Sequence, residues 1–178
     1  QLSEVKYNLS SKIINSSIID SYGLTWIATD EGLNMYDGNK THVFTSVLSD
    51  KKSLLNSAVI NIIELKNREL LFISRDGLSI YDRPDFSFKR IKIPSPISIL
   101  VDDQDKKLFV STSNNGIYVL DFDFNFIRQF KYDPLNPFSL STNSFNEKGR
   151  QKSMKLLNRS GDIIIGTDQG LNILSKES

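Results

Sequence analysis

The sequence predicts an all-β protein built from repeated four-stranded antiparallel sheets, and three observations support this fold class. First, one pattern occurs four times: an apolar run, a small or hydroxyl residue, a polar turn, a glycine and a second apolar run. Second, the glycines of this pattern recur about 40 to 55 residues apart, and they are Gly32, Gly77, Gly116 and Gly170. Third, no repeat shows a helical period of 3.6 residues over a convincing length. Such a repeat of short strands is typical of the blades of a β-propeller.

The first repeat, residues 11–47, contains every element of one blade. Its apolar runs are INSSIID, LTWIAT, LNMYD and THVFTS, and the turns between them are SYG, DEG and DGN. Runs rich in β-branched and aromatic residues favour strands, and Asp, Asn and Gly between them favour tight turns. The order therefore predicts an antiparallel meander of four strands.

The second and third repeats, residues 54–93 and 96–132, follow the same order. The second reads AVINIIEL, LLFIS, LSIYD and FSFKRIKI, and the third reads ISILVDD, LFVST, IYVLD and FNFIRQFKY. In the third repeat, Phe122, Phe124 and Phe126 alternate with polar residues. A period of two predicts that they lie on one strand with a single apolar face.

The fourth repeat, residues 143–178, has only three predicted strands, MKLLN, IIIGT and LNILS. An unpaired sheet edge favours association with another strand. The segment EVKYNL at residues 4–9 is a candidate closing strand, either for this sheet or for a further blade outside the chain. We expect the second arrangement, in which the chain is part of a larger propeller. The polar segment NEKGRQK, residues 146–152, is predicted to be a mobile insertion.

The composition excludes several classes of function. The 178 residues include 22 basic and 21 acidic side chains, a balance that argues against a surface devoted to nucleic acid. No apolar stretch is long enough to span a membrane. The chain has no cysteine and a single histidine, His42, so disulfides and a zinc site are excluded and no cofactor is indicated.

One acidic turn is a candidate for chemistry. It carries three carboxylates, of the kind that acid–base catalysis or a calcium ion requires, on Asp102, Asp103 and Asp105. However, DDQDKK lacks the glycine and the distal glutamate of a calcium loop, so we predict a solvent-exposed hairpin turn and no metal site. The segment IIDSYGLTW is similar to the Asp-box hairpin of sialidases, but the spacing from Asp20 to Gly23 is one residue too long.

The main aromatic residues are assigned to packing. Trp26 occupies a second-strand position that aliphatic residues fill in the other repeats. This position favours a place in the core over a platform on which a sugar stacks. Tyr36 and Tyr81 occupy matching third-strand positions and are also predicted to pack.

Propellers bind ligands at one face of the ring, where loops converge, and the four glycine-containing turns are the candidate loops. Their polar side chains suit the hydroxyl groups of a saccharide, although tight turns prefer the same residue types. The candidate ligand-binding residues are Asp30, Glu31, Arg75, Asp76, Asn114, Asn115, Asp168 and Gln169.

Two motifs together resemble a known family. The segment DPLNPFSLSTN before the fourth repeat and WIATDEGLNMYD in the first resemble the two-component regulator propeller repeat, in four copies over nearly the whole chain. The second repeat departs from it with Leu71 in place of Trp26, and the third has a longer turn. The resemblance implies that residues 1–178 belong to the periplasmic sensor region of a hybrid histidine kinase of Bacteroides-type bacteria.

The same resemblance implies a function outside the cytoplasm. Such a sensor detects glycan fragments and controls genes for polysaccharide utilisation through a phosphorelay. The full-length protein would be anchored in the inner membrane and homodimeric, with its kinase and DNA-binding parts outside these residues. The implied partners are an oligosaccharide and the rest of the sensor polypeptide. A non-catalytic scaffold for protein–protein interaction is the first alternative, and a carbohydrate-active enzyme is the second.

Overall fold

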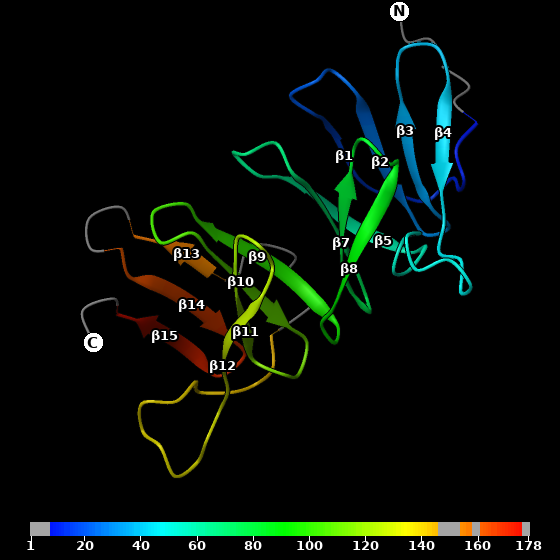
Figure 1. Ribbon diagram of the computed structural model, residues 1–178. Coiled ribbons are helices and arrows are strands. Elements are labelled where there is room, and N and C mark those ends of the chain that lie inside the picture. Colours follow the sequence, from blue (N-terminus) through cyan, green and yellow to red (C-terminus); the bar gives the residue numbers. More distant parts are fainter. Residues whose placement is uncertain (1–7, 146–153, 158–160, 176–178) are drawn as a thin grey trace, which may run out of the picture. The chain divides into compact units, whose positions relative to one another are not determined.

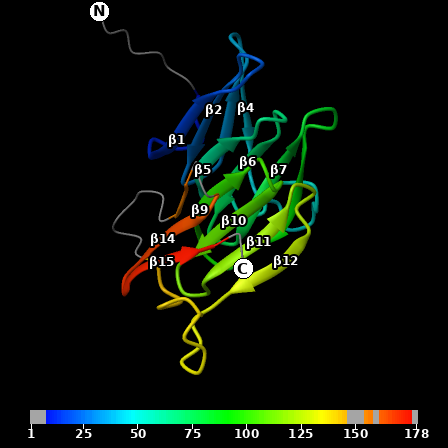
Figure 2. The same ribbon diagram turned by 90° about the vertical axis from the view of Figure 1, so that its left-hand side faces the viewer.

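A computed structural model describes residues 8–145, 154–157 and 161–175. These residues form antiparallel β-sheets in which sequential strands are neighbours (Figures 1 and 2). The prediction of an all-β fold made of antiparallel meanders is confirmed. None of the described segments is a helix long and apolar enough to cross a bilayer. The candidate closing strand at residues 4–9 and the insertion at residues 146–152 lie largely or wholly outside the described residues.

The strands follow the repeats. The first sheet contains β1 (Ile14–Ile19), β2 (Thr25–Thr29), β3 (Leu33–Tyr36) and β4 (Thr41–Phe44). The second contains β5 (Val59–Glu64), β6 (Leu70–Ser74), β7 (Gly77–Asp82) and β8 (Ser87–Lys92). The third contains β9 (Pro96–Asp102), β10 (Lys107–Thr112), β11 (Ile117–Asp121) and β12 (Phe126–Phe130). The fourth contains, among the described residues, β13 (Met154–Leu156), β14 (Ile163–Thr167) and β15 (Gly170–Leu174).

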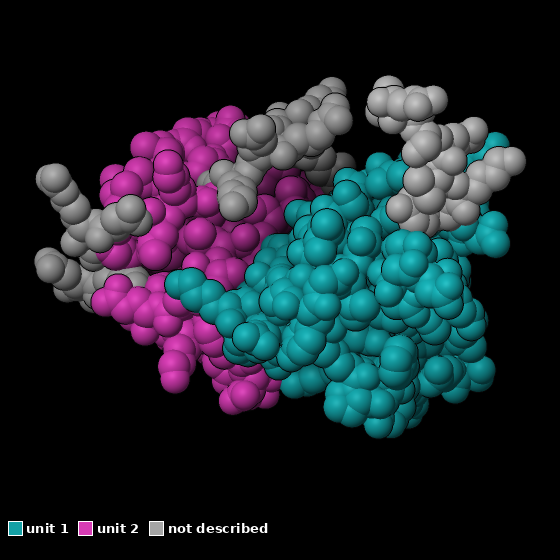
Figure 3. Space-filling model, turned by 90° about the horizontal axis from the view of Figure 1, so that it is seen from above, with its two compact units in different colours: residues 1–92 teal, residues 93–178 magenta. Residues whose placement is uncertain are grey.

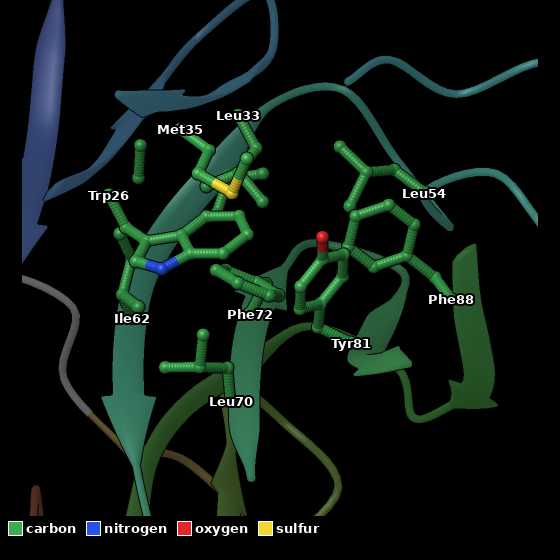
Figure 4. Packing of buried hydrophobic residues seen from close by; sticks show 11 residues of the cluster. Trp26, Leu33, Met35, Leu54, Ile62, Leu70, Phe72, Tyr81 and Phe88 are labelled. Atoms are coloured by element: carbon green, nitrogen blue, oxygen red, sulfur yellow. The ribbon is translucent and has the colours of Figure 1, made fainter. Parts of the chain in front are cut away.

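The chain divides into two compact units, residues 1–92 and 93–178, coloured separately in Figure 3. The buried cluster of unit 1 combines four aromatic rings with aliphatic side chains (Figure 4). Trp26 is 0% exposed and packs against Phe72 and Tyr81, with ring centroids 5.3 and 4.8 Å away. The assignment of Trp26 and Tyr81 to the core is therefore confirmed, while Tyr36 is only partly buried.

The core of unit 2 is mainly aliphatic. Val119, Ile163 and Ile165 are buried in it, and Phe145 and Met154 pack beside them. β-Branched residues on facing strands interdigitate well, which explains how this unit forms a core with few aromatic rings.

The structure corrects the prediction for the phenylalanines of the third repeat. Phe122 and Phe124 lie in the turn before β12, and Phe126 is the first residue of that strand. Phe124 is buried with a φ of 65°, in the left-handed region, while Phe126 is exposed. The backbone NH of Asn125 donates to Asp121 Oδ1 at 2.8 Å and closes the turn. Phenylalanines and polar residues keep alternating through the turn, so the sequence pattern does not show that the chain changes direction there.

A second correction concerns the acidic turn of the third repeat. Asp102 ends β9 and is 0% exposed, so the prediction of a solvent-exposed turn is wrong for this residue. Its Oδ1 accepts hydrogen bonds from the backbone NH groups of Gln104 and Asp105, at 3.2 and 3.3 Å. Asp102 therefore organises the turn from inside the fold, while Asp105 is exposed.

Candidate functional site

The four glycine-containing turns share one hydroxyl contact. The last hydroxyl residue of the preceding strand donates to the carbonyl of the turn glycine in every repeat. The four pairs are Thr29–Gly32 at 2.8 Å, Ser74–Gly77 at 3.2 Å, Thr112–Gly116 at 2.9 Å and Thr167–Gly170 at 3.0 Å. This contact explains why each apolar run ends in Ser or Thr, and it holds the turn residues in place.

The aspartates of the turns are also bound to their own repeats. Asp30 Oδ1 accepts from Asn15 Nδ2 at 2.8 Å, and Asp76 Oδ2 accepts from Asn56 Nδ2 at 2.7 Å. In the fourth repeat, Ser144 Oγ donates to Asp168 Oδ2 at 3.0 Å. Each aspartate therefore fixes the segment at or before the first strand of its sheet, which gives it a structural role.

The other candidate residues lie at the turn tips. Glu31, Arg75, Asn114 and Gln169 are exposed. Asn115 is partly buried, and its carbonyl accepts from Gln129 Nε2 at 2.6 Å. The structure thus places all eight candidates at corresponding turns, two per repeat. The side chains of Asp30, Asp76 and Asp168 bond within their own repeats.

Sequence analysis missed a polar pair that recurs in two repeats. Ser10 N donates to Asn34 Oδ1 and Asn34 Nδ2 donates to Ser10 Oγ, both at 2.9 Å. Ser141 and Asn172 make the same two bonds at the same distances. The signal was present as Leu-Ser before the repeat and Gly-Leu-Asn within it. These motif residues support the backbone, so their presence does not identify a ligand.

A cavity of about 220 Å³ lies in unit 1, at a place that sequence analysis did not consider. Its lining residues come from the first two sheets: Leu24, Met35, Asp37, His42, Tyr81, Arg83 and Phe86. The β3–β4 and β7–β8 turns contribute to it. Because successive turns of a meander alternate between the two ends of the sheet, the cavity lies at the opposite end from the turns of Asp30 and Asp76.

Asp20 and Arg83 form a fixed ion pair beside this cavity. Asp20 Oδ2 accepts from Arg83 Nη2 at 2.9 Å and from Trp26 Nε1 at 2.8 Å, while Oδ1 accepts from the backbone NH groups of Tyr22 and Leu24. Burial raises the pKa of Asp20, but the hydrogen bonds outweigh it and hold the pKa below its usual value. Arg83 also lies 4.2 Å from the centre of the Tyr22 ring.

Asp37 and His42 form the second polar pair of the cavity. Asp37 Oδ1 accepts from the backbone NH groups of Lys40 and Asn39 at 2.7 and 2.9 Å. These two bonds, the one from Lys40 first, lower the pKa of Asp37, so it is a carboxylate at neutral pH. His42 Nε2 lies 3.4 Å from Asp37 Oδ2. The cavity therefore combines acceptors, donors and apolar rings.

Among the described residues, no group of three or more His, Cys, Asp or Glu side chains is placed to hold a metal ion. The side chains around the cavity fit binding by hydrogen bonds and ring contacts.

Comparison with known proteins identifies the fold. No protein-family model and no curated protein sequence matches the chain. The extracellular domain of a hybrid two-component system from B. thetaiotaomicron is 21% identical, with a TM-score of 0.74 over 96% of this chain and 24% of that one. PorZ, a surface component of the type-IX secretion system of Porphyromonas gingivalis, is 15% identical, with a TM-score of 0.66 over 93% of this chain and 26% of PorZ. Virginiamycin B lyase from Staphylococcus aureus is 15% identical, with a TM-score of 0.59 over 93% of this chain and 53% of the lyase.

These likenesses establish what the chain is at the level of fold. It corresponds to part of a β-propeller, and it spans 24% of the solved two-component extracellular domain and 53% of the lyase. The similar structures include an extracellular domain, a secretion component and an enzyme. At identities this low, the fold is what they share with this chain, and the activity is a separate question.

Proposed function

We propose that the chain is a ligand-sensing part of the extracytoplasmic region of a hybrid two-component histidine kinase. The supporting observation is the coincidence of two independent likenesses. The chain is similar over 96% of its length to an extracellular domain of such a system. It also carries WIATDEGLNMYD and DPLNPFSLSTN, the motifs that resemble the repeat of these sensors.

The proposed ligand is a glycan fragment, which the chain binds without chemical change. Binding favours one arrangement of a membrane-anchored homodimer on the periplasmic side of the inner membrane. A kinase outside these residues responds to that arrangement and switches on genes for polysaccharide utilisation. The eight turn residues named above are proposed to contact the ligand, because carboxylates, amides and a guanidinium suit saccharide hydroxyls.

A scaffold for protein–protein interaction is the second candidate, and one observation favours it. Leu135 and Phe138 are 91% and 95% exposed in the loop before the fourth repeat. Ser139 Oγ accepts from Asp133 N and donates to Asp133 O, both at 2.9 Å, so the loop is held closed. Exposed apolar and aromatic side chains on a held loop offer apolar surface to a partner protein.

Calorimetric titration with glycan fragments tests the sensing proposal. Partial digests of starch, arabinan and α-mannan are suitable probes, and chromatography of the recovered sugars shows whether any is cleaved. The sensing proposal expects saturable binding of at least one digest and full recovery of unchanged sugar. Cleavage would instead support a carbohydrate-active enzyme, and failure of every digest to bind would contradict glycan sensing.

A further inference from the structure

The cavity of unit 1 combines the motif residues Asp37 and Tyr81 with Arg83 and Phe86, which lie outside the motif. Leu24, Met35 and Tyr81 line it with apolar surface, and Asp37 and Arg83 supply polar groups. Its volume of about 220 Å³ is below the roughly 300–1,000 Å³ of sites for drug-sized ligands. The space therefore suits one small ring.

Phe86 is an unusual residue for its position. It has a φ of 51°, in the left-handed region where Gly and Asn are the favoured residues, and its side chain is 57% exposed. Its ring centroid lies 6.3 Å from both His42 and Tyr81. Phe124 occupies a similar turn with a φ of 65°, but its side chain is buried. Packing thus accounts for Phe124, while the exposed ring of Phe86 is placed at the cavity.

The polar groups of the cavity are held in fixed positions. Arg83 is paired with Asp20 at 2.9 Å, and Asp37 faces His42 at 3.4 Å. A phosphate would lie beside the Asp37 carboxylate and an ammonium group beside the Arg83 guanidinium, so repulsion between like charges disfavours both. Hydroxyl groups both donate and accept hydrogen bonds, so a neutral ligand with hydroxyl groups fits the site best.

We propose that this cavity binds one pyranose ring of a glycan fragment. The C–H face of the sugar lies against the exposed ring of Phe86, and its hydroxyl groups bond to Asp37 and Arg83. The inference rests on the proposed function and adds a second contact site to the eight turn residues. This site lies at the other end of the strands from the turns of Asp30 and Asp76.

The two methionines of the chain make a direct test available. Met35 lines the cavity, and Met154 lies in the core of unit 2. Isotope labelling of methionine methyl groups gives one nuclear magnetic resonance signal for each. The probes are methyl glucoside, methyl galactoside and methyl mannoside, each titrated into the full chain. The expected result is a saturable shift of the Met35 signal by at least one glycoside, with the Met154 signal unchanged.

Substitution of Phe86 separates binding from folding. Phe86→Asn removes the ring and suits the left-handed backbone, so the variant is expected to fold. It should weaken glycoside binding by about tenfold or more, equivalent to 1.4 kcal/mol. Lys106→Asn is the matched control, because Lys106 is exposed with a φ of 51° in a turn of unit 2. This control should bind like the unmodified chain.

The results of these experiments distinguish failure of the cavity proposal from failure of the glycan-sensing proposal. If saturation-transfer signals show that a glycoside binds while Met35 does not respond, the glycan function stands and the cavity proposal is overturned. Equal affinity in Phe86→Asn and the unmodified chain also overturns it. If glycosides fail to bind but a glycan digest binds and Glu31→Ala abolishes that binding, the ligand lies at the turns and the cavity proposal falls. If neither glycosides nor digests bind, the proposed function itself fails.

Discussion

The two units use the same repeat but fill their cores differently. In unit 1, the Trp26 ring packs against both Phe72 and Tyr81. Unit 2 is built around aliphatic side chains such as Val119 and Ile165. The backbone contacts of the turns nevertheless recur in both units. The comparison teaches that the repeat specifies turns and strand order, while the core accepts different side chains that fill the space.

The two units also differ in the contacts of a buried aspartate, which lies in the β1–β2 turn of unit 1 and at the β9–β10 turn of unit 2. Asp20 and Asp102 are both buried at the end of a first strand, and each accepts two backbone NH groups of its own turn. In unit 1, Asp20 additionally binds Trp26 and Arg83. Asp20 therefore stabilises its own turn and also links the first two sheets through Arg83.

Removal of the Trp26 ring is expected to have the largest effect. Trp26→Ala should lower the free energy of unfolding by about 4 kcal/mol, because it leaves a large cavity among buried rings. The methyl signals of Met35 and Met154 would report urea unfolding of units 1 and 2 separately. We expect the Met35 transition to move further than the Met154 transition. Equal displacement of both would show that the units unfold as one.

Loss of the Asp20 carboxylate is expected to rank second. Asp20→Ala leaves the Trp26 NH and the Arg83 guanidinium without their acceptor, which should lower the free energy of unfolding by about 3 kcal/mol. Trp26 fluorescence during urea unfolding measures this change. Asp82→Ala is the control, since Asp82 is exposed and ends β7 in unit 1. A comparable loss in the control would contradict a special role for Asp20.

The loops between the repeats of each unit offer a smaller effect. Val47 N donates to Ser53 Oγ at 2.7 Å in unit 1, and Asp133 N donates to Ser139 Oγ at 2.9 Å in unit 2. Ser53 Oγ also accepts from Arg90 Nη2. Ser139→Ala should therefore lower the free energy of unfolding by about 1 kcal/mol, and Ser53→Ala by about 2 kcal/mol. Urea unfolding of the two variants tests this, and equal losses would show that the Arg90 contact contributes little.

The pH dependence of unit 1 is expected to be the smallest effect. The pKa of Asp20 is lowered in the folded state. Its contribution to stability is therefore complete above the unfolded pKa, and it is lost as pH falls through the folded pKa. We expect the Trp26 fluorescence transition to move to lower urea below about pH 4. Asp20→Asn should show a weaker dependence on pH, and an unchanged dependence would assign the effect to other carboxylates.

Much of the fold follows from local patterns. The strands of the first repeat and its turns could be located from β-branched runs and from Asp-Gly segments, because both act within a few residues. The burial of Trp26 also followed from its alignment with aliphatic residues. The turn at Phe124 escaped prediction because alternation of residue types persists through a change in chain direction.

Only part of the candidate site could be predicted from the sequence. The turns of Asp30 and Asp76 could be identified, but their bonds to Asn15 and Asn56 could not. These bonds join residues that are 15 and 20 positions apart. The cavity beside Phe86 could not be located from the sequence, because its residues come from two repeats that packing brings together.

The sequence by itself determined the repeat, the strand order and the turns, because these depend on contacts within one sheet. Only the tertiary structure decided which carboxylates are buried and which are exposed. Asp20 and Arg83 are 63 residues apart, and packing of the first two sheets of unit 1 brings them to 2.9 Å. The same packing creates the cavity. Burial and partner choice depend on surfaces that meet after the strands have formed, and a local pattern does not encode them.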